Sequence, residues 1–250
     1  MYIYNIIFFK YITIYLKNNI INYYIMNRNN IFIHIALLDG WDEIIKRYIL
    51  LIDNSGLLLR IEKIYICFVG DYTKVHLDFD KNIFQKIIII YVDSNLESFE
   101  VPTQKVLYDF ACNNKDSNIL YIHTKGVGKV KNVCVEDWVH YMLYFLIENH
   151  EKTLEKLEYS DTVGVDLREW PTLHYSGNFW WAKSSYILTL PDPILFKNLS
   201  KYPNPLNSER HNQEFWICYD KNKIHCALWE CGIHCFERHL HRYTRENYIR

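Results

Sequence analysis

The chain has 250 residues, of which 50% are hydrophobic and 23% are charged, and its formal net charge is -1. This length and apolar content suffice for a full core, so the sequence predicts one large α/β domain with short appendages and excludes a disordered chain. The near-neutral charge and the lack of a long basic stripe argue against nucleic acid as a partner, although a local anion site stays open. Seven scattered cysteines, without a disulfide framework or a clear secretory signal, favour a reducing, cytoplasmic location.

The first residues differ from the rest of the chain. Met1 to Met26 is rich in Ile, Tyr and Phe but is interrupted by Lys10 and Lys17, and its longest uncharged run is shorter than the ~18 apolar residues that a spanning helix needs. It is either a weak signal-anchor or a poorly packed extension upstream of a start at Met26. No small-residue cleavage site follows, which favours the extension and makes a membrane partner unexpected. We therefore expect residues 1–30 to be an extension and residues 31–250 to form a single domain.

Apolar periodicity and turn residues place the expected elements along the chain. Uninterrupted apolar runs, such as Lys86 to Asp93, fit strands that are buried on both faces of a mostly parallel sheet. The predicted strands are Ile31 to Leu38, Ile64 to Gly70, Lys86 to Asp93, Asn118 to Ile122, Asp161 to Asp166, a sixth within Leu173 to Pro191, and Ile224 to Trp229. The predicted helices are Trp41 to Leu51, Pro102 to Cys112, Asp137 to Asn149 continuing into Lys152 to Leu157, and Glu209 to Ile217. This alternation predicts an α/β fold without internal repeats.

Polar residues follow the fourth predicted strand directly, at His123-Thr124-Lys125-Gly126. In open α/β sheets, ligands bind at the carboxyl ends of the strands. Lys125 could hold a phosphate as a point charge, Gly126 would let the backbone turn around it, and His123 could bind a metal or donate to a diphosphate oxygen. The alternatives are a solvated lysine and a histidine with a structural hydrogen bond.

The tripeptide Ser176-Gly177-Asn178 precedes a block of aromatic residues that includes Trp180 and Trp181. A strand that only buries itself favours branched apolar residues, so a glycine between two polar residues indicates close approach of a ligand or of another backbone. Asn178 offers a donor and acceptors, and the two indoles could offer flat faces to a sugar or a base. The alternative is a β-bulge beside a tryptophan-rich corner of the core.

Five motifs occur in a fixed order along the chain. They are HTKG at 123–126, Trp138 with Met142 on the next helix, DTVG at 161–164, HYSGNFWWAKSSYILTLP at 174–191 and EFWI at 214–217. Over roughly Ile31 to Tyr219 this set resembles a poorly characterised glycosyltransferase-like family that is met in bacterial polysaccharide clusters and in large DNA viruses. The resemblance implies a GT-A type fold, which is a Rossmann-like nucleotide-binding α/β sandwich. It also implies transfer of a sugar from a nucleoside-diphosphate sugar to an acceptor hydroxyl on a glycan or a protein, in the host cytoplasm or the virion if the protein is viral.

The chain departs from the GT-A pattern at the motif that usually binds the metal ion. Such enzymes commonly place Asp-x-Asp after the fourth strand to hold Mn²⁺ or Mg²⁺, whereas this chain has His123-Thr124-Lys125 there. Asp78-Phe79-Asp80 has the right letters but falls between the second and third strands, where we expect a solvated turn. Two ways to neutralise the leaving diphosphate stay open, namely a divalent metal held by other groups, or Lys125 and His123 directly.

An acceptor hydroxyl also needs a base. Glu214 is the candidate, since a carboxylate on the helix after the sixth strand resembles the position of the GT-A catalytic acid residue, although it could be an ordinary helical glutamate. Asp166 is the reserve, and its neighbour Arg168 could instead make it a salt-bridge partner. The competing class of function is a catalytically inactive module that binds carbohydrate or nucleotide.

The C-terminal stretch is dense in cysteine and histidine. These residues are Cys226, Cys231 and Cys235, with His225, His234, His239 and His241. Their spacing raises a zinc site but matches no common finger pattern, so buried reduced cysteines and surface histidines are the favoured explanation.

Overall fold

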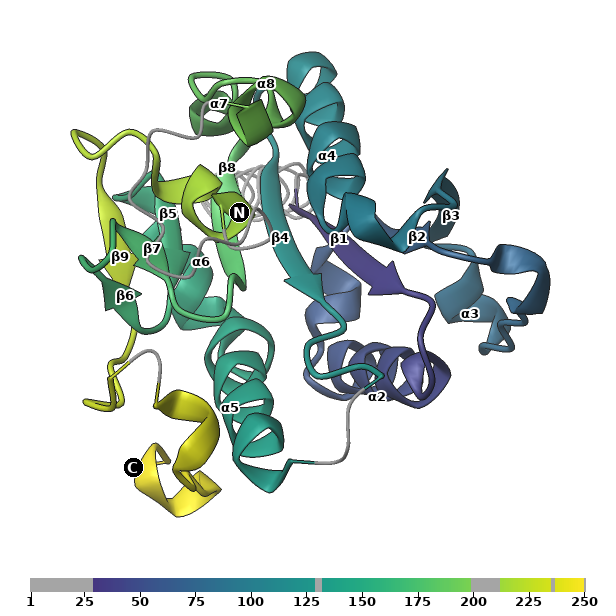
Figure 1. Cartoon of the computed structure of the whole chain (residues 1–250), viewed down its shortest axis with the longest axis horizontal. Coiled ribbons are helices and arrows are strands. Elements are labelled where there is room, and N and C mark those ends of the chain that lie inside the picture. Colours follow the sequence, from purple (N-terminus) through teal and green to yellow (C-terminus); the bar gives the residue numbers. More distant parts are fainter. Residues whose placement is uncertain (1–28, 129–131, 199–211, 235–236, 250) are drawn as a thin grey trace, which may run out of the picture.

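A seven-stranded sheet organises the molecule (Figure 1). The computed structural model describes residues 29–128, 132–198, 212–234 and 237–249. The strands of the sheet are, in spatial order, β3 (Ile87–Asp93), β2 (Lys63–Val69), β1 (Asn29–Ala36), β4 (Asn118–His123), β8 (Trp180–Lys183), β5 (Thr162–Gly164) and β9 (His225–Ala227). All neighbours are parallel except β8, which runs antiparallel to both β4 and β5. This is the mostly parallel central sheet of an α/β fold that the sequence predicted.

Two hydrophobic cores lie on the two faces of the sheet. Alternate residues of a strand point to opposite faces, so Ile31 and Ile33 of β1 join one core while Phe32 joins the other. The first core is covered by α2 (Trp41–Asn54), α5 (Val133–Leu143) and α6 (His150–Glu158), and the second by α4 (Val101–Asn113), α7 (Ser184–Ile187), α8 (Pro193–Asn198) and the 3₁₀ turn η5 (Gln213–Cys218). The continuous apolar runs of the central strands are explained by burial on both faces.

Most predicted elements are found, with three corrections in the second half of the chain. Leu173 to Pro191 is not one strand, because a short hairpin of β6 (Leu167–Arg168) and β7 (His174–Tyr175) comes first and a turn then leads into β8. The predicted helix at Glu209 to Ile217 is the 3₁₀ turn η5 over its described part, and residues 209–211 lie outside the described residues. The long helix predicted from Asp137 is interrupted by a π turn at Tyr144–Glu148 before α6 begins.

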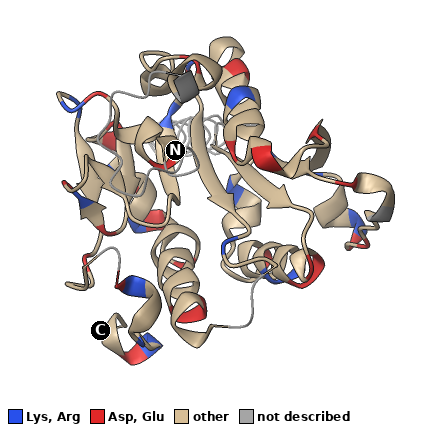
Figure 2. Cartoon of the chain, in the orientation of Figure 1, with Lys and Arg blue, Asp and Glu red and all other residues tan. Residues whose placement is uncertain are grey.

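The C-terminal segment packs against α5. Its two 3₁₀ turns are η6 (Arg238–Leu240) and η7 (Arg245–Asn247), and Tyr248 is buried against the ring of Tyr141 at a centroid distance of 5.5 Å. Acidic and basic residues are interspersed over the elements (Figure 2), so neither sign collects into a single region of the described chain. In the part of the chain that the structure describes, no helix is long and apolar enough to cross a membrane. Of the predicted extension at residues 1–30, residues 1–28 lie outside that part, and Asn29 and Asn30 belong to β1.

Candidate functional site

The strand order of the sheet reverses between the carboxyl ends of β1 and β4, which is the position where open α/β sheets form a crevice for a ligand. β1 is followed by β2 on one side, whereas the chain returns to β4 on the other side, and ligands in open α/β sheets bind at such a reversal of strand order. The two strand ends are joined by hydrogen bonds, since the Ala36 amide donates to Thr124 Oγ1 at 3.2 Å and the Thr124 amide donates to the His34 carbonyl at 3.0 Å. Lys125 and Gly126 therefore leave β4 at the mouth of this crevice.

A pocket of about 630 Å³ lies beside the crevice, on the side of α2 and α5, and we name it the switch-point pocket. The residues that line it are Asp39, Gly40, Glu43, Ile44, Arg47, Lys125, Gly126, Val127, Gly128, Asn132, Val135, Glu136, Val139 and His239. The loop after β4 reaches the pocket through two glycines at positive φ, Gly126 at 84° and Gly128 at 70°. A Cβ on Gly128 would lie 2.9 Å from the Cβ of Leu38, so only glycine lets this loop pack against the loop after β1.

Positive and negative side chains face each other across the switch-point pocket. Lys125 holds its ammonium 4.1 Å from the centroid of the Trp138 ring, a cation–π contact that keeps the charge at the wall of the pocket. Arg47 lines the same pocket, and its buried Nε has no hydrogen-bond partner in the described part of the chain. The guanidinium charge of Arg47 makes this residue a candidate to hold an anionic ligand in the pocket. The carboxylates of Asp39, Glu43 and Glu136 line the same pocket and repel anions. We therefore expect an anion to bind only where it contacts Lys125 and Arg47 directly.

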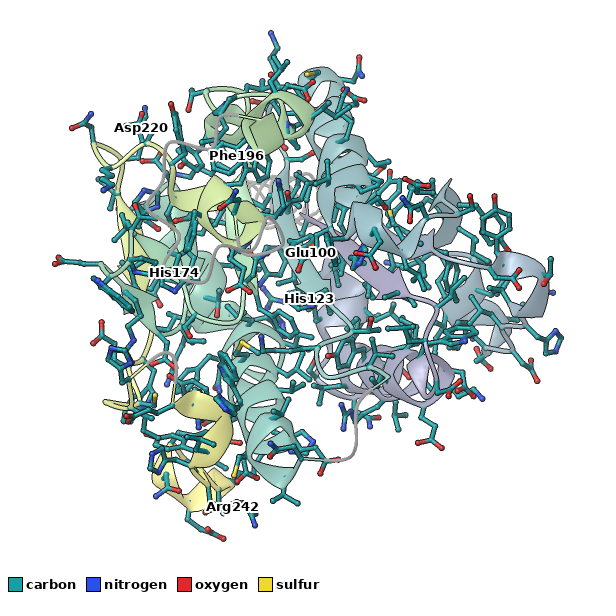
Figure 3. The ribbon with its side chains drawn as sticks, viewed as in Figure 1. Glu100, His123, His174, Phe196, Asp220 and Arg242 are labelled. Carbon is teal, nitrogen blue, oxygen red and sulfur yellow. The ribbon has the colours of Figure 1, made fainter. Side chains whose placement is uncertain are left out.

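On the other face of β4, four polar side chains form what we name the Glu100 cluster. Glu100, at the N-terminus of α4, accepts hydrogen bonds through Oε2 from Tyr121 Oη at 2.8 Å and from Asn178 Nδ2 at 2.6 Å. Its Oε1 lies 3.9 Å from Nε2 of His123, and that nitrogen is 3.0 Å from the carbonyl oxygen of Gly177. Figure 3 shows Glu100 and His123 close together near the middle of the molecule. The cluster ties α4, β4 and the turn before β8 together, and Glu100 is its partly exposed member.

Two residues of unusual backbone conformation border this cluster. Asn178 has φ 56° and Phe99, directly before Glu100, has φ 51°. Asparagine tolerates the left-handed region because of its short polar side chain, whereas a positive φ at phenylalanine is rare and costs of the order of 1–3 kcal/mol. The hydrogen bonds of Glu100 and Asn178 hold both segments in place. Backbone strain of this kind concentrates at functional sites, which makes the cluster a second part of the candidate site.

The predicted base Glu214 lies on η5 with a half-buried side chain, on the same face as the Glu100 cluster. It does not line the switch-point pocket. Burial raises the pKa of Tyr121 well above its ordinary value, the charge of Glu100 adds to this effect, and Glu214 contributes a smaller share. Burial also lowers the pKa of His174, which Glu214 partly offsets. These effects place the carboxylate of Glu214 within electrostatic reach of the cluster.

Asp166, the reserve base, is a salt-bridge partner in the structure. Its side chain is buried, and its Oδ1 accepts hydrogen bonds from Nη2 of Arg168 at 2.9 Å and from the Cys231 amide at 2.8 Å. Its Oδ2 has no hydrogen-bond partner within the described residues. The backbone carbonyl of Asp166 accepts from the Ser176 amide at 3.0 Å. Asp166 therefore joins β5, the hairpin and the loop after β9, and the alternative that Arg168 suggested is the correct one.

Comparison with known proteins places the chain in a family. Residues 31–226 match the family model described as Domain of unknown function (DUF8361). The chain belongs to this family. No curated protein matches it. Among solved structures, it is similar to 4-diphosphocytidyl-2C-methyl-D-erythritol synthase from Anaerococcus prevotii DSM 20548, with 12% identity, a TM-score of 0.43, and coverage of 89% of this chain and 95% of that chain.

In this DUF8361 chain, the glycine of the Ser176-Gly177-Asn178 turn serves packing. A Cβ on Gly177, which has φ 99°, would lie 2.5 Å from Sδ of Met142 and 3.2 Å from Cε2 of Trp138. Helix α5 therefore occupies the space that we had expected for a ligand. Ser176 is buried as well. The turn contributes to the candidate site through the Gly177 carbonyl and the Asn178 side chain.

The predicted sugar-stacking role of Trp180 and Trp181 is wrong. Both indoles are fully buried, so neither offers a face to a ligand. Trp180 stacks on Tyr121 at a centroid distance of 5.1 Å and donates its Nε1 hydrogen to Asn178 Oδ1, and Trp181 donates to the Leu146 carbonyl. Adjacent strand residues point to opposite faces, so the pair fills both cores of the sheet. The alternative of a tryptophan-rich core corner describes these two residues.

Metal ligands were also predicted as open alternatives. Among the described residues, no three His, Cys, Asp or Glu side chains gather closely enough to hold a metal ion, and Cys235 lies outside them. His225 instead bonds to Thr162 Oγ1 at 2.7 Å and to the Asp220 carbonyl at 3.0 Å. Asp78 and Asp80 are exposed, as we expected, and Asp80 caps the short helix α3 (Lys81–Phe84), whereas Phe79 between them packs against the first core. A divalent ion at the switch-point pocket would need oxygens of its ligand to complete its coordination.

Sequence reasoning missed Glu100 and Arg47 as site residues. Neither residue was singled out from the sequence: Arg47 falls within the helix predicted at Trp41 to Leu51, and Glu100 comes just before the helix predicted from Pro102. One signal was present in the sequence for each. Glu100 comes directly before a helix that leads to the predicted β4 site, and Arg47 lies about two turns into the helix that follows the carboxyl end of β1.

Proposed function

We propose that this protein is a glycosyltransferase that moves a sugar from a nucleoside-diphosphate sugar to a hydroxyl of a glycan or of a protein-linked acceptor. The observation that carries the proposal is the switch-point pocket, where Lys125 and Arg47 lie at the carboxyl ends of β1 and β4 in a GT-A-like sheet. The motifs from His123 to Ile217 that resemble a glycosyltransferase-like family support it. Membership of DUF8361 names no activity.

The leaving diphosphate is assigned to the switch-point pocket. Lys125 and Arg47 neutralise the negative charge that develops as the bond from the anomeric carbon to the diphosphate breaks. Gly126 and Gly128 bring backbone close to that ligand, and His123 lies at the end of the same strand. Mn²⁺ or Mg²⁺ would supply further neutralisation on the diphosphate if the reaction needs it.

The acceptor is assigned to the side of the Glu100 cluster. Glu214 takes the proton from the acceptor hydroxyl while the oxygen of that hydroxyl forms a bond to the anomeric carbon. The diphosphate departs with the electron pair of the broken bond. Glu100 positions Asn178 and, through the turn before β8, the carbonyl of Gly177. Asp166 is left out of this step because Arg168 and the Cys231 amide already occupy one of its oxygens.

Release of nucleoside diphosphate tests the proposal. The protein is incubated with a panel of nucleotide sugars, with and without Mn²⁺, and the free diphosphate is measured; binding of each donor is measured by calorimetry on the same preparation. The proposal expects release with at least one donor and loss of release in Glu214→Gln. Binding of a donor without release from any of them favours the inactive binding module instead. If the protein neither binds a donor nor releases diphosphate, the transferase and the inactive binding module are both overturned.

A further inference from the structure

A second hollow, of about 560 Å³, lies beside the β6–β7 hairpin and shares no lining residue with the switch-point pocket. We name it the hairpin hollow. One wall is the hairpin, with Leu167, Arg168, Glu169 and Trp170, and the other is the loop after β9, with Glu230, Gly232, Ile233 and His234. The motifs that resemble a glycosyltransferase-like family leave most of this region out, and it has no assigned role.

Arg168 holds the two walls of the hairpin hollow together. Its Nη2 donates to Asp166 Oδ1 at 2.9 Å and to the carbonyl of Ile233 at 3.2 Å, and its Nη1 lies 3.8 Å from Oε2 of Glu230. Since Asp166 is buried, this ion pair is shielded from water and fixes the guanidinium. The hollow is therefore preformed, which lowers the entropic cost of binding a ligand there.

Trp170 is the prominent apolar group of the hairpin hollow. It is 52% exposed at the tip of the hairpin, and its ring centroid lies 5.7 Å from that of His234. A tryptophan carries a large apolar area with a flat face, and leaving it in water forgoes the free energy of burial. In contrast to the buried Trp180 and Trp181, this indole can receive the apolar C–H face of a sugar ring.

The charges around Trp170 select the class of ligand. Glu169 and Glu230 are exposed carboxylates that accept hydrogen bonds, whereas the charge of Arg168 is balanced by Asp166. Arg168, the arginine of the lining, is thus already paired with Asp166 and Glu230, and it offers little to the phosphates of a nucleotide. Hydroxyl groups, in contrast, donate well to carboxylates. Flat apolar contact combined with hydroxyl recognition fits a carbohydrate.

The hairpin links this hollow to the reaction centre assigned above. From Trp170 the chain reaches Gly177, whose carbonyl lies 3.0 Å from His123 Nε2, within no more than about 25 Å of extended backbone. We propose that the hairpin hollow is the distal subsite for an acceptor glycan, which binds one sugar unit on Trp170 while a hydroxyl further along reaches the Glu100 cluster. The acceptor assignment rests on the proposed transferase function; binding of carbohydrate does not.

Binding of neutral oligosaccharides tests this subsite. The full chain is titrated by calorimetry with tetrasaccharides built from glucose, mannose, xylose, galactose and N-acetylglucosamine, and with a nucleoside diphosphate and a lysine-rich peptide as ligands of other classes. Four proteins are compared, namely wild type, Trp170→Ala, Trp170→Phe and Tyr159→Ala. Tyr159 is the matched control, since it is an aromatic residue with 76% exposure that lines neither hollow.

We expect at least one oligosaccharide to bind to wild type. Truncation of a central tryptophan removes enough binding free energy that Trp170→Ala should weaken oligosaccharide binding by about tenfold or more. Trp170→Phe should keep most of the affinity, and Tyr159→Ala should leave it unchanged. Failure of every oligosaccharide to bind, equal affinity in Trp170→Ala, or Trp170-dependent binding of the peptide in place of the sugars overturns the subsite.

The outcome separates this inference from the proposed function. Release of nucleoside diphosphate without Trp170-dependent oligosaccharide binding refutes the subsite and leaves the transferase intact. Trp170-dependent oligosaccharide binding without any donor turnover supports the subsite and refutes the transferase. Thermal unfolding of Trp170→Ala is measured in parallel, and its exposed side chain predicts an unchanged Tm.

Discussion

Lys125 and Arg168 are both basic residues that follow a strand of the sheet, yet the structure uses them differently. Lys125 holds its ammonium over the Trp138 ring at the wall of the switch-point pocket, while Arg168 turns its guanidinium to the buried carboxylate of Asp166. Lys125 thus lines a pocket that a ligand can enter. Arg168 is paired with Asp166 inside the fold, and its contacts hold the two walls of the hairpin hollow together.

The difference explains why the two hollows suit different ligands. The switch-point pocket combines Lys125 and Arg47 with backbone at two glycines, which suits a diphosphate. The hairpin hollow has exposed carboxylates and an exposed indole, which suit a neutral ligand rich in hydroxyls. The Ser176-Gly177-Asn178 turn lies between them, bonded to Asp166 on one side and to His123 and Glu100 on the other.

The largest effect is expected at Glu214. A base acts on the hydroxyl proton in the transition state and adds little to donor binding, so Glu214→Gln should lower the single-turnover rate by about 10²–10⁴-fold with donor affinity and Tm unchanged. Rate, donor affinity and thermal unfolding are measured on one preparation, because partial unfolding would imitate lost chemistry. An unchanged rate would show that Glu214 is not the base.

Asp166→Asn is the matched contrast to Glu214→Gln. Asparagine tolerates the φ of 51° at this position but removes the charge that Arg168 binds, so we expect a loss of about 1.5–3 kcal/mol in unfolding free energy with the transfer rate largely kept. Urea unfolding measures the first and single-turnover kinetics the second. A large fall in rate with normal stability would reverse the roles of the two carboxylates.

The junction between the two regions is tested at Gly177. Alanine there meets Met142 and Trp138 and also adopts a strained φ of 99°, so Gly177→Ala should cost about 3 kcal/mol in unfolding free energy. Gly56→Ala is the control, because φ is 78° there but no atom lies within 4 Å of the added Cβ, and backbone strain alone predicts about 1 kcal/mol. Equal losses by urea unfolding would mean that α5 yields to the new methyl group and that packing does not require this glycine.

At Lys125 the expected effect is on donor affinity alone. Lys125→Ala removes a charged donor, so donor binding should weaken by about 1.5–3 kcal/mol, or roughly 10- to 150-fold in Kd. Lys221→Ala removes an exposed lysine from outside the pocket and should change nothing. Calorimetry with the donor found in the panel measures both. An unchanged Kd in Lys125→Ala would take the diphosphate away from the switch-point pocket.

The central sheet could be predicted from sequence because its cause is local. The apolar run at Ile87 to Asp93 and the polar residues after Ile122 are contiguous, and their meaning at the carboxyl end of a strand follows from the fold class. The position of Lys125 after β4 was predicted in this way, and its role stays a prediction. A short contiguous pattern thus sufficed for the strands and for the residues that directly follow them.

The rest of the site depends on contacts between distant segments. Glu100 meets Asn178 across 78 positions of sequence, and nothing in the residues beside either one indicates the contact. Trp180 and Trp181 have the composition of a sugar site, but the strand β8 that carries them is a central strand, and both faces of the sheet there are covered by packed cores, which buries both indoles. Composition identified aromatic residues; only the packing of distant segments on the sheet distinguishes these two from the exposed Trp170.

The smallest expected effect is a pH dependence of thermal stability that arises in the β6–β7 hairpin and not at the switch-point pocket. Burial of His174 in β7 lowers its pKa below the ordinary value of about 6.5; Arg168 lowers it further, and the Thr172 carbonyl and Glu214 partly oppose the shift. The unfolded chain then binds the proton more tightly than the folded chain, so the stability that neutral His174 provides is full above about pH 6.5 and is lost as the pH falls towards the lowered pKa.

The test compares Tm at pH 7.5 and pH 5 in wild type and in His174→Gln. Since other buried histidines with lowered pKa, such as His150 and His225, contribute to both proteins, the difference between the two curves isolates His174, and wild type should lose more stability on acidification. Parallel curves would mean that the hairpin accommodates a charged His174, and that Glu214 or water compensates for its burial.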